Sequence, residues 1–104
     1  MSSTAERQIV HVVLFRWAET ATGAAIDAAM DGLRALEHKI EGIVELSAGE
    51  NFSDRGKGYT HVLFVKFANR AALEAYVPHP EHQRVVQTLI APIRSDVLAV
   101  DYEA

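Results

Sequence analysis

The sequence predicts an α+β domain with a ferredoxin-like βαββα(α)β protomer, in which helices lie on one side of a four-stranded antiparallel sheet. Four segments rich in β-branched and aromatic residues alternate with segments whose apolar residues recur at helical spacing. A turn-rich stretch separates the second and third strand segments, as in a hairpin. With 104 residues, of which 49% are hydrophobic and 23% charged, the chain suffices for one compact domain. Residues 1–8 are polar and are expected to form a flexible tail, so the domain comprises residues 9–104.

The first half of the domain is expected to contain one strand and one long helix. Residues 9–17, IVHVVLFRW, show no strict polar alternation, which indicates a strand with both faces buried. Thr22 can cap a helix whose apolar positions recur through Ile40. Gly42 suits the left-handed conformation that stops such a helix.

The second half begins with a predicted hairpin. Its strands are residues 43–52 and 59–67, and the turn-rich stretch SDRGKG lies between them. The glycines of this stretch precede a strand and not a helix, so a hairpin turn explains them better than a phosphate-binding loop. Residues 97–102, VLAVDY, are expected to close the sheet as its fourth strand.

Two prolines in the stretch AYVPHPEHQ, residues 75–83, are expected to separate two short helices. Asn69 can cap the first, which carries Tyr76 and Val77 inward and ends at the first proline because proline has no N–H. The second proline suits the first position of the next helix, and His79 before it is expected to serve the helix start with its ring exposed. The inward face of the second helix is predicted to comprise His82, Val85, Val86 and Leu89.

Both faces of the central strands are apolar, although the helices can cover only one of them. Val12 and Val13 lie on opposite faces of the first strand. Leu63 and Phe64 likewise lie on opposite faces of the third strand. The uncovered face needs a second apolar layer, most simply the same sheet of another copy, so the sequence predicts a homodimer through the sheet faces.

The composition excludes several classes of partner. The formal net charge is −4 and no basic cluster is long enough to neutralise a row of phosphates, so no nucleic-acid partner is expected. The longest apolar run falls far short of the ~20 residues of a membrane span, so no membrane partner is expected either. Without cysteine the chain has neither disulfides nor thiolate metal sites, and a cytoplasmic location is expected.

Several stretches match one family: HVVLFRW, the central residues 35–67, and, more specifically, AYVPHPEH and the terminal DVLAVDY. Through them nearly the whole chain resembles the stress-responsive A/B barrel (Dabb) family. The resemblance implies a dimeric α/β barrel, in which two ferredoxin-like protomers associate sheet to sheet. For function it implies less, since the family includes plant stress proteins without a settled reaction and a plant polyketide cyclase.

The resemblance also implies a site, because a tyrosine and a histidine placed as Tyr76 and His82 form the catalytic pair of that cyclase. Further histidines occupy the places of His11 and His61. A histidine with a pKa near ~6.5 can accept a proton at neutral pH, and a buried tyrosine hydroxyl can donate to a carbonyl oxygen. We therefore expect His82 as general base and Tyr76 as donor. His11 and His61 would orient a small apolar or carbonyl ligand.

Leu63 and Val77 are expected to contact the same ligand from the apolar wall. A zinc site of His11, His61 and His82 is the metal alternative, but no closely spaced histidine pair anchors it, so neither metal nor other cofactor is expected. The strand histidines have a purely structural alternative, in which they hydrogen-bond across the strands. For the whole protein we expect a polyketide-cyclase-like or lyase-like general acid/base enzyme acting on a small carbonyl compound. The alternative is a non-catalytic stress-response or small-ligand-binding dimeric module.

Overall fold

The computed structural model describes residues 6–104. Its elements follow one another as β1 (Ile9–Trp17), α1 (Gly23–Ala35), η1 (Leu36–His38), β2 (Ile43–Glu50), β3 (His61–Phe67), α2 (Arg70–Tyr76), α3 (Pro80–Val85), η2 (Val86–Ile90) and β4 (Arg94–Glu103). Here η1 is a 3-10 turn and η2 is a short π-helix that continues α3. Of the tail predicted over residues 1–8, residues 1–5 lie outside the described residues.

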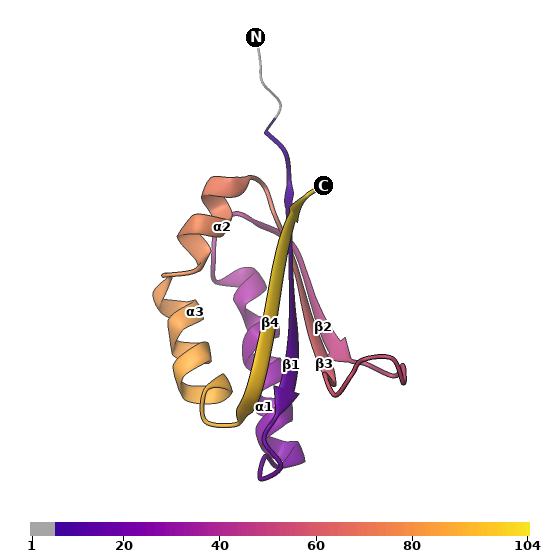
Figure 1. The fold of residues 1–104 in the computed structure, drawn as a ribbon. Helices are drawn as coiled ribbons and strands as arrows, with labels where there is room; N and C mark the ends of the chain where they lie inside the picture. The colour runs from indigo at the N-terminus through magenta and orange to yellow at the C-terminus, as the bar shows by residue number, and fades with distance from the viewer. Residues whose placement is uncertain (1–5) are drawn as a thin grey trace.

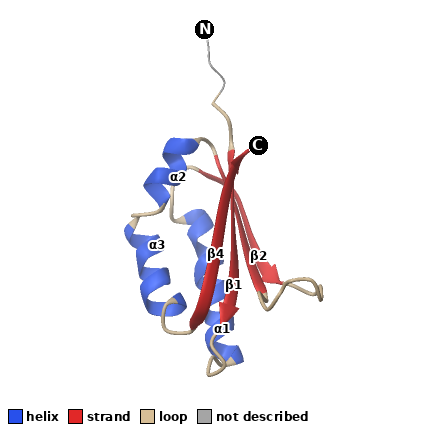
Figure 2. Ribbon diagram, viewed as in Figure 1, coloured by secondary structure: helices blue, strands red, loops and turns tan. Residues whose placement is uncertain are grey.

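The four strands form one antiparallel sheet in the order β2-β3-β1-β4. The helices α1, α2 and α3 lie on one side of it, and no helix within residues 6–104 covers the other side (Figure 1, Figure 2). The connection between β2 and β3 extends away from the helices (Figure 1). The predicted ferredoxin-like protomer is therefore confirmed.

The strands differ from their predicted ranges at the ends. β2 and β3 are shorter, because the Asn51 side chain accepts a hydrogen bond from the Ser53 N–H at 2.9 Å and turns the chain out of the sheet after Glu50. β4 is longer than the predicted 97–102, because β1 pairs with it along its whole length. The β1–β4 ladder is thus the longest of the three, and β1 and β3 form the centre of the sheet.

The first helix begins as predicted and ends early. The Thr22 hydroxyl accepts a hydrogen bond from the backbone N–H three residues later at 3.1 Å. The helix ends at Ala35 and not near residue 40, because the Leu36 carbonyl accepts N–H groups from both the third and the fourth following residue, which tightens the chain into η1. Gly42 has the expected positive φ of 94°, and a Cβ there would lie 2.6 Å from the Ala72 Cβ.

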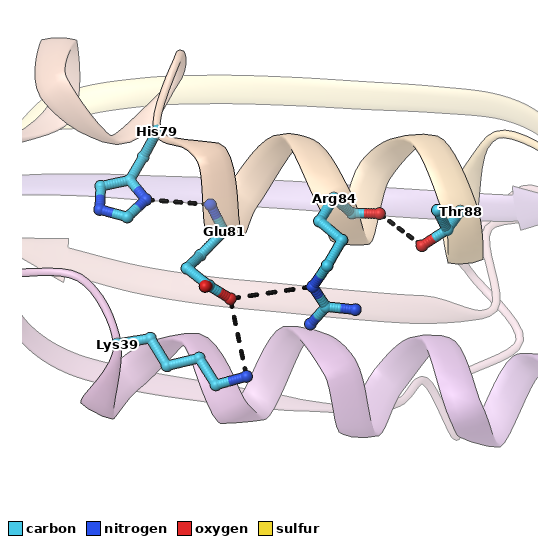
Figure 3. Close-up of polar contacts among 5 residues, drawn as sticks. All are labelled: Lys39, His79, Glu81, Arg84 and Thr88. Carbon is cyan, nitrogen blue, oxygen red and sulfur yellow. Dashed lines mark hydrogen bonds and ion pairs between the residues drawn. The ribbon is translucent and has the colours of Figure 1, made fainter.

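The two short helices begin where predicted. The Asn69 side chain caps α2, which ends before Pro78, and Pro80 is the first residue of α3. His79 Nδ1 accepts a hydrogen bond from the Glu81 N–H at 3.1 Å (Figure 3), which confirms its role at the helix start. The prediction of an exposed His79 ring is wrong: the ring is half-buried, because the capping bond holds it against the helix end.

Glu81 of α3 forms an ion pair with Lys39, the residue after η1 (Figure 3). Its carboxylate oxygen lies 3.8 Å from Arg84 Nε and 3.7 Å from Lys39 Nζ. All three side chains reach solvent, so each ion pair contributes at most ~1 kcal/mol. The position of α3 therefore depends mainly on its apolar contacts with the sheet and α1.

The core fills the space between the helices and the sheet. It comprises Ile9, Val13, Phe15, Ala29, Met30, Leu33, Leu36, Ile40, Leu46, Leu63, Val65, Phe67, Tyr76, Val85 and Ile90. The opposite face of the sheet is apolar but open. On β4 the side chains of Leu98, Val100 and Tyr102 are 46%, 52% and 57% exposed. Within residues 6–104 no helix has the length and apolar character to cross a membrane.

Candidate functional site

A cavity of about 290 Å³ lies between the sheet and the segment from the end of α2 to η2. It is lined by His11, Val13, Phe15, Leu33, Leu63, Tyr76, Val77, His82, Val86, Ile90, Arg94, Val97 and Ala99. Five of the six predicted site residues are in this lining, namely His11, Leu63, Tyr76, Val77 and His82. The sixth, His61, is not.

Val77 lies at the rim of the cavity and not, as predicted, on an inward face. Its side chain is 49% exposed, because α2 ends at Tyr76 and the chain turns outward at Pro78. Its backbone carbonyl no longer belongs to a helix ladder and accepts hydrogen bonds from His82 Nδ1 at 2.9 Å and Gln83 Nε2 at 2.8 Å. Val77 therefore contributes both a wall contact and the anchor of the His82 ring.

Tyr76 brings a free hydroxyl into the cavity wall. The residue is completely buried, yet its hydroxyl has no hydrogen-bond partner within the described part of the chain. Its ring packs against Phe67 at 5.0 Å and against His82 at 4.3 Å between centroids. Burial raises the pKa of Tyr76 above its ordinary value, so the phenol stays protonated and able to donate throughout the neutral range.

His82 carries a defined tautomer. Because the Val77 carbonyl can only accept, His82 Nδ1 holds the proton, and Nε2 of the neutral ring keeps a free lone pair. Burial lowers the pKa of His82, with smaller contributions from His11 and His79, while the bond to Val77 acts in the opposite direction. The ring is thus neutral at pH 7 and can accept a proton at Nε2.

His11 lies on the sheet side of the cavity and pairs with an acid that sequence analysis did not select. Its Nδ1 lies 2.5 Å from Asp101 Oδ1, across the β1–β4 ladder. The carboxylate accepts the Nδ1 proton, so in the neutral form of the ring the lone pair lies on Nε2. The His11 ring stands edge-on to Tyr76, with the centroids 5.9 Å apart.

His61 shares the helix-covered face of the sheet with His11, as predicted, but it does not reach the cavity. Its Nδ1 accepts a hydrogen bond from Trp17 Nε1 at 2.9 Å and lies 3.0 Å from Thr60 Oγ1. Its register partner, Phe15, lies four positions along β1 from His11. The three imidazoles of the zinc alternative therefore do not converge, and within residues 6–104 no group of three or more potential metal ligands does so.

Two polar side chains at the site, Asp101 and Arg94, were missed by the sequence analysis. Asp101 follows Val97 and Ala99 at alternating positions of the last strand, so strand periodicity alone places it on the cavity face. Arg94 lies outside the predicted strand. It lines the cavity because of an irregularity in the pairing of β4, which the sequence around Arg94 does not predict. Arg94 lines the cavity itself, whereas Asp101 acts on it only through its contact with His11.

The arrangement places a proton acceptor beside a proton donor. The Tyr76 and His82 rings are in contact, and among residues 6–104 neither the Tyr76 O–H nor His82 Nε2 has a hydrogen-bond partner. His11 Nε2 supplies a second acceptor whose tautomer Asp101 fixes. A carbonyl compound in such a site can lose a proton to one group while its oxygen is held by another.

Comparison with known proteins assigns the domain. The chain is similar to a stress-response A/B barrel domain-containing protein of Arabidopsis thaliana, with 32% identity over 105 residues that cover 99% of this chain and 40% of the relative. A second such protein of the same plant is also 32% identical, over 108 residues that cover 100% of this chain and 49% of the relative. The chain thus spans less than half the length of the curated relatives that it matches.

Solved structures agree in fold. A dimeric ferredoxin-like protein of unknown function from Jannaschia sp. is 30% identical, with a TM-score of 0.79 and coverage of 93% of this chain and 99% of that one. A hydroxynitrile lyase from Passiflora edulis has a TM-score of 0.86 at 18% identity, covering 97% and 95% of the two chains, and shares the fold. The sequence pattern of the Stress responsive A/B Barrel Domain (Dabb) matches residues 9–104. This chain therefore belongs to the Dabb family.

Proposed function

We propose that this protein is a general acid/base enzyme that enolises a small carbonyl compound with an apolar body, in the manner of a cyclase or lyase. The observation that carries the proposal is the contact between Tyr76 and His82, whose ring centroids lie 4.3 Å apart in the cavity wall. One side chain holds a buried hydroxyl without a partner among the described residues, and the other a neutral imidazole with a free Nε2. Enolisation needs such a donor and such a base.

In the proposed reaction, His82 Nε2 takes a proton from the carbon beside the substrate carbonyl. The electron pair of the broken C–H bond forms a carbon–carbon double bond, and the carbonyl π electrons move to the oxygen. The Tyr76 O–H donates a hydrogen bond to that oxygen, in a site shielded from bulk water. The enolate carbon then attacks a second carbonyl carbon of the substrate, and the new alkoxide takes the proton from His82.

The remaining predicted site residues have supporting roles in this proposal. His11 Nε2 accepts a hydrogen bond from a substrate hydroxyl or enol, and Asp101 positions the His11 ring. Leu63 and Val77 contact the apolar body of the substrate. His61 does not touch the substrate; it positions Trp17, which stacks on Phe15 of the cavity wall with centroids 5.2 Å apart. The Passiflora edulis hydroxynitrile lyase has the same fold, so the scaffold is compatible with an enzyme.

We also propose that the protein is a homodimer through the open sheet face. Leu98, Val100 and Tyr102 would otherwise leave a contiguous apolar strip of β4 in water. The similar Jannaschia sp. protein is dimeric, which supports the same assembly here. In a two-fold dimer the strip is covered by the same sheet face of the partner.

The enzyme proposal is tested by proton exchange in heavy water with methyl hexyl ketone, a neutral compound whose protons beside the carbonyl exchange slowly. The protein is expected to accelerate their replacement by deuterium, followed by proton NMR, because His82 removes them and solvent returns deuterons. His82→Gln serves as the matched blank. Binding of the ketone with no acceleration over this blank would instead identify a non-catalytic binding module.

The exchange rate is expected to depend on pH through the protonation of His82. The base must be neutral, and burial lowers the pKa of His82, so kcat/KM should be constant above pH ~6.5 and fall at lower pH, by about tenfold per unit below the pKa. No loss is expected up to pH ~10, because the pKa of Tyr76 is raised above that of free tyrosine. A rate that falls as the pH rises through 7 would contradict the assignment of His82 as base.

A further inference from the structure

Arg94 reaches the cavity face because of a β-bulge. β1 and β4 pair without interruption as far as Arg16 opposite Asp96, but the next pair is Trp17 opposite Arg94. Ser95 is therefore an extra residue in β4, and its hydroxyl donates a hydrogen bond to the Arg16 carbonyl at 3.1 Å. Under strict alternation Arg94 would lie on the same face as Asp96, away from the helices, so the bulge re-aims it into the cavity lining.

The Arg94 guanidinium has no partner of its own within residues 6–104, neither an ion pair nor a hydrogen bond. Of the six other arginines, four contact carbonyl or carboxylate oxygens: Arg16, Arg34, Arg70 and Arg84. Asp96, two residues along, accepts a hydrogen bond from the Tyr59 hydroxyl at 2.5 Å on the other face of the sheet. No acidic residue of the described chain lines the cavity, so the charged group at this end of it is the guanidinium of Arg94, an exposed residue.

Arg94 and the Tyr76–His82 contact lie at opposite ends of the cavity. His82 near the start of α3 and Ile90 at the end of η2 both line it, a separation of ~12 Å along a helix. On the sheet, His11 pairs with Asp101 near the end of β4, whereas Arg94 is the first residue of that strand. The wall between the two ends is apolar and comprises Val13, Phe15, Val86, Val97 and Ala99.

We propose that the cavity takes an elongated organic acid, with its carboxylate on Arg94 and an apolar chain along the middle wall. The guanidinium fork matches a carboxylate with two parallel N–H···O bonds, so it selects acids over neutral compounds of the same shape. The second polar group of this acid, a carbonyl at Tyr76 and His82, rests on the proposed function. Recognition of the carboxylate by Arg94 does not depend on it.

The test is calorimetric titration of the full chain with octanoate and with octanamide, which share the apolar chain and differ in charge. Wild type is expected to bind octanoate more tightly. Arg94→Gln should weaken octanoate binding by ~10- to 100-fold, the usual effect of losing a charge-assisted hydrogen bond, and leave octanamide binding unchanged. Arg84→Gln is the matched control, because it removes the same charge from α3 outside the cavity lining and should change neither affinity.

Equal affinities of wild type for the two ligands would overturn the inference, as would an equal loss of both in Arg94→Gln or no octanoate binding at millimolar concentration. Failure of the enzyme proposal looks different. A preference for octanoate that depends on Arg94, without exchange on methyl hexyl ketone, would refute the enzyme and keep the acid-binding site. Exchange on methyl hexyl ketone without a preference for octanoate would refute the acid-binding site and keep the enzyme proposal.

Discussion

His82→Gln is expected to remove most of the exchange activity while the protein stays folded. Glutamine keeps much of the volume and can still donate to the Val77 carbonyl, but it has no titratable nitrogen. The exchange rate should fall by ~10²- to 10⁴-fold, the usual contribution of a general base. Exchange kinetics and thermal unfolding are measured on the same samples. His38→Gln is the matched control, because the His38 side chain is 87% exposed on η1.

The companion change, Tyr76→Phe, should lower the rate without lowering stability. It removes only a hydroxyl that is buried and unpaired among the described residues, a group whose burial costs ~1–3 kcal/mol. The melting temperature should therefore be at least that of wild type while the exchange rate falls. If either variant instead loses ~1–3 kcal/mol of stability and no ligand or substrate distinguishes it from wild type, the pair is structural and the enzyme proposal must be dropped.

Val100→Asp is expected to dissociate the proposed dimer. Val100 lies opposite Val12, which in turn lies opposite Phe64, so the three form a row across the open face. Two-fold symmetry buries two copies of any change in this row. An unpaired buried charge costs ~3–5 kcal/mol, so the dimer Kd should rise by at least ~10²-fold. Light scattering at micromolar concentration should then give a monomer, where wild type gives a dimer.

Val77→Asp is the matched control for this experiment. Val77 and Val100 are 49% and 52% exposed in the protomer, but they lie on opposite sides of the sheet. In an isolated protomer the two substitutions would have similar small effects, so only an interface on the open face makes them differ. The interface proposal would be refuted by a wild-type monomer, or by a Val100→Asp protein that remains as dimeric as Val77→Asp.

The sequence by itself determined the order of the elements, the helix starts and the two apolar faces of the sheet. Thr22 and Asn69 cap helices as predicted, and Pro80 opens α3. Capping, proline geometry and hydrophobic period involve residues within a few positions of one another, so local sequence carries them. The same periodicity brought His11, Tyr76 and His82 to one side of the sheet, where all three line the cavity.

Only the tertiary structure decided how the polar groups pair and which of them reach the cavity. His61 has the strand face expected of a site residue, yet it bonds to Trp17, because the register places it four residues from His11 along β1. The partner of His11, Asp101, comes from a strand 90 residues away. Arg94 enters the lining through a single extra residue in β4, and such an insertion exchanges the faces of a strand without changing its hydrophobic pattern. Register and bulges depend on pairing across the whole sheet, and that information is not local.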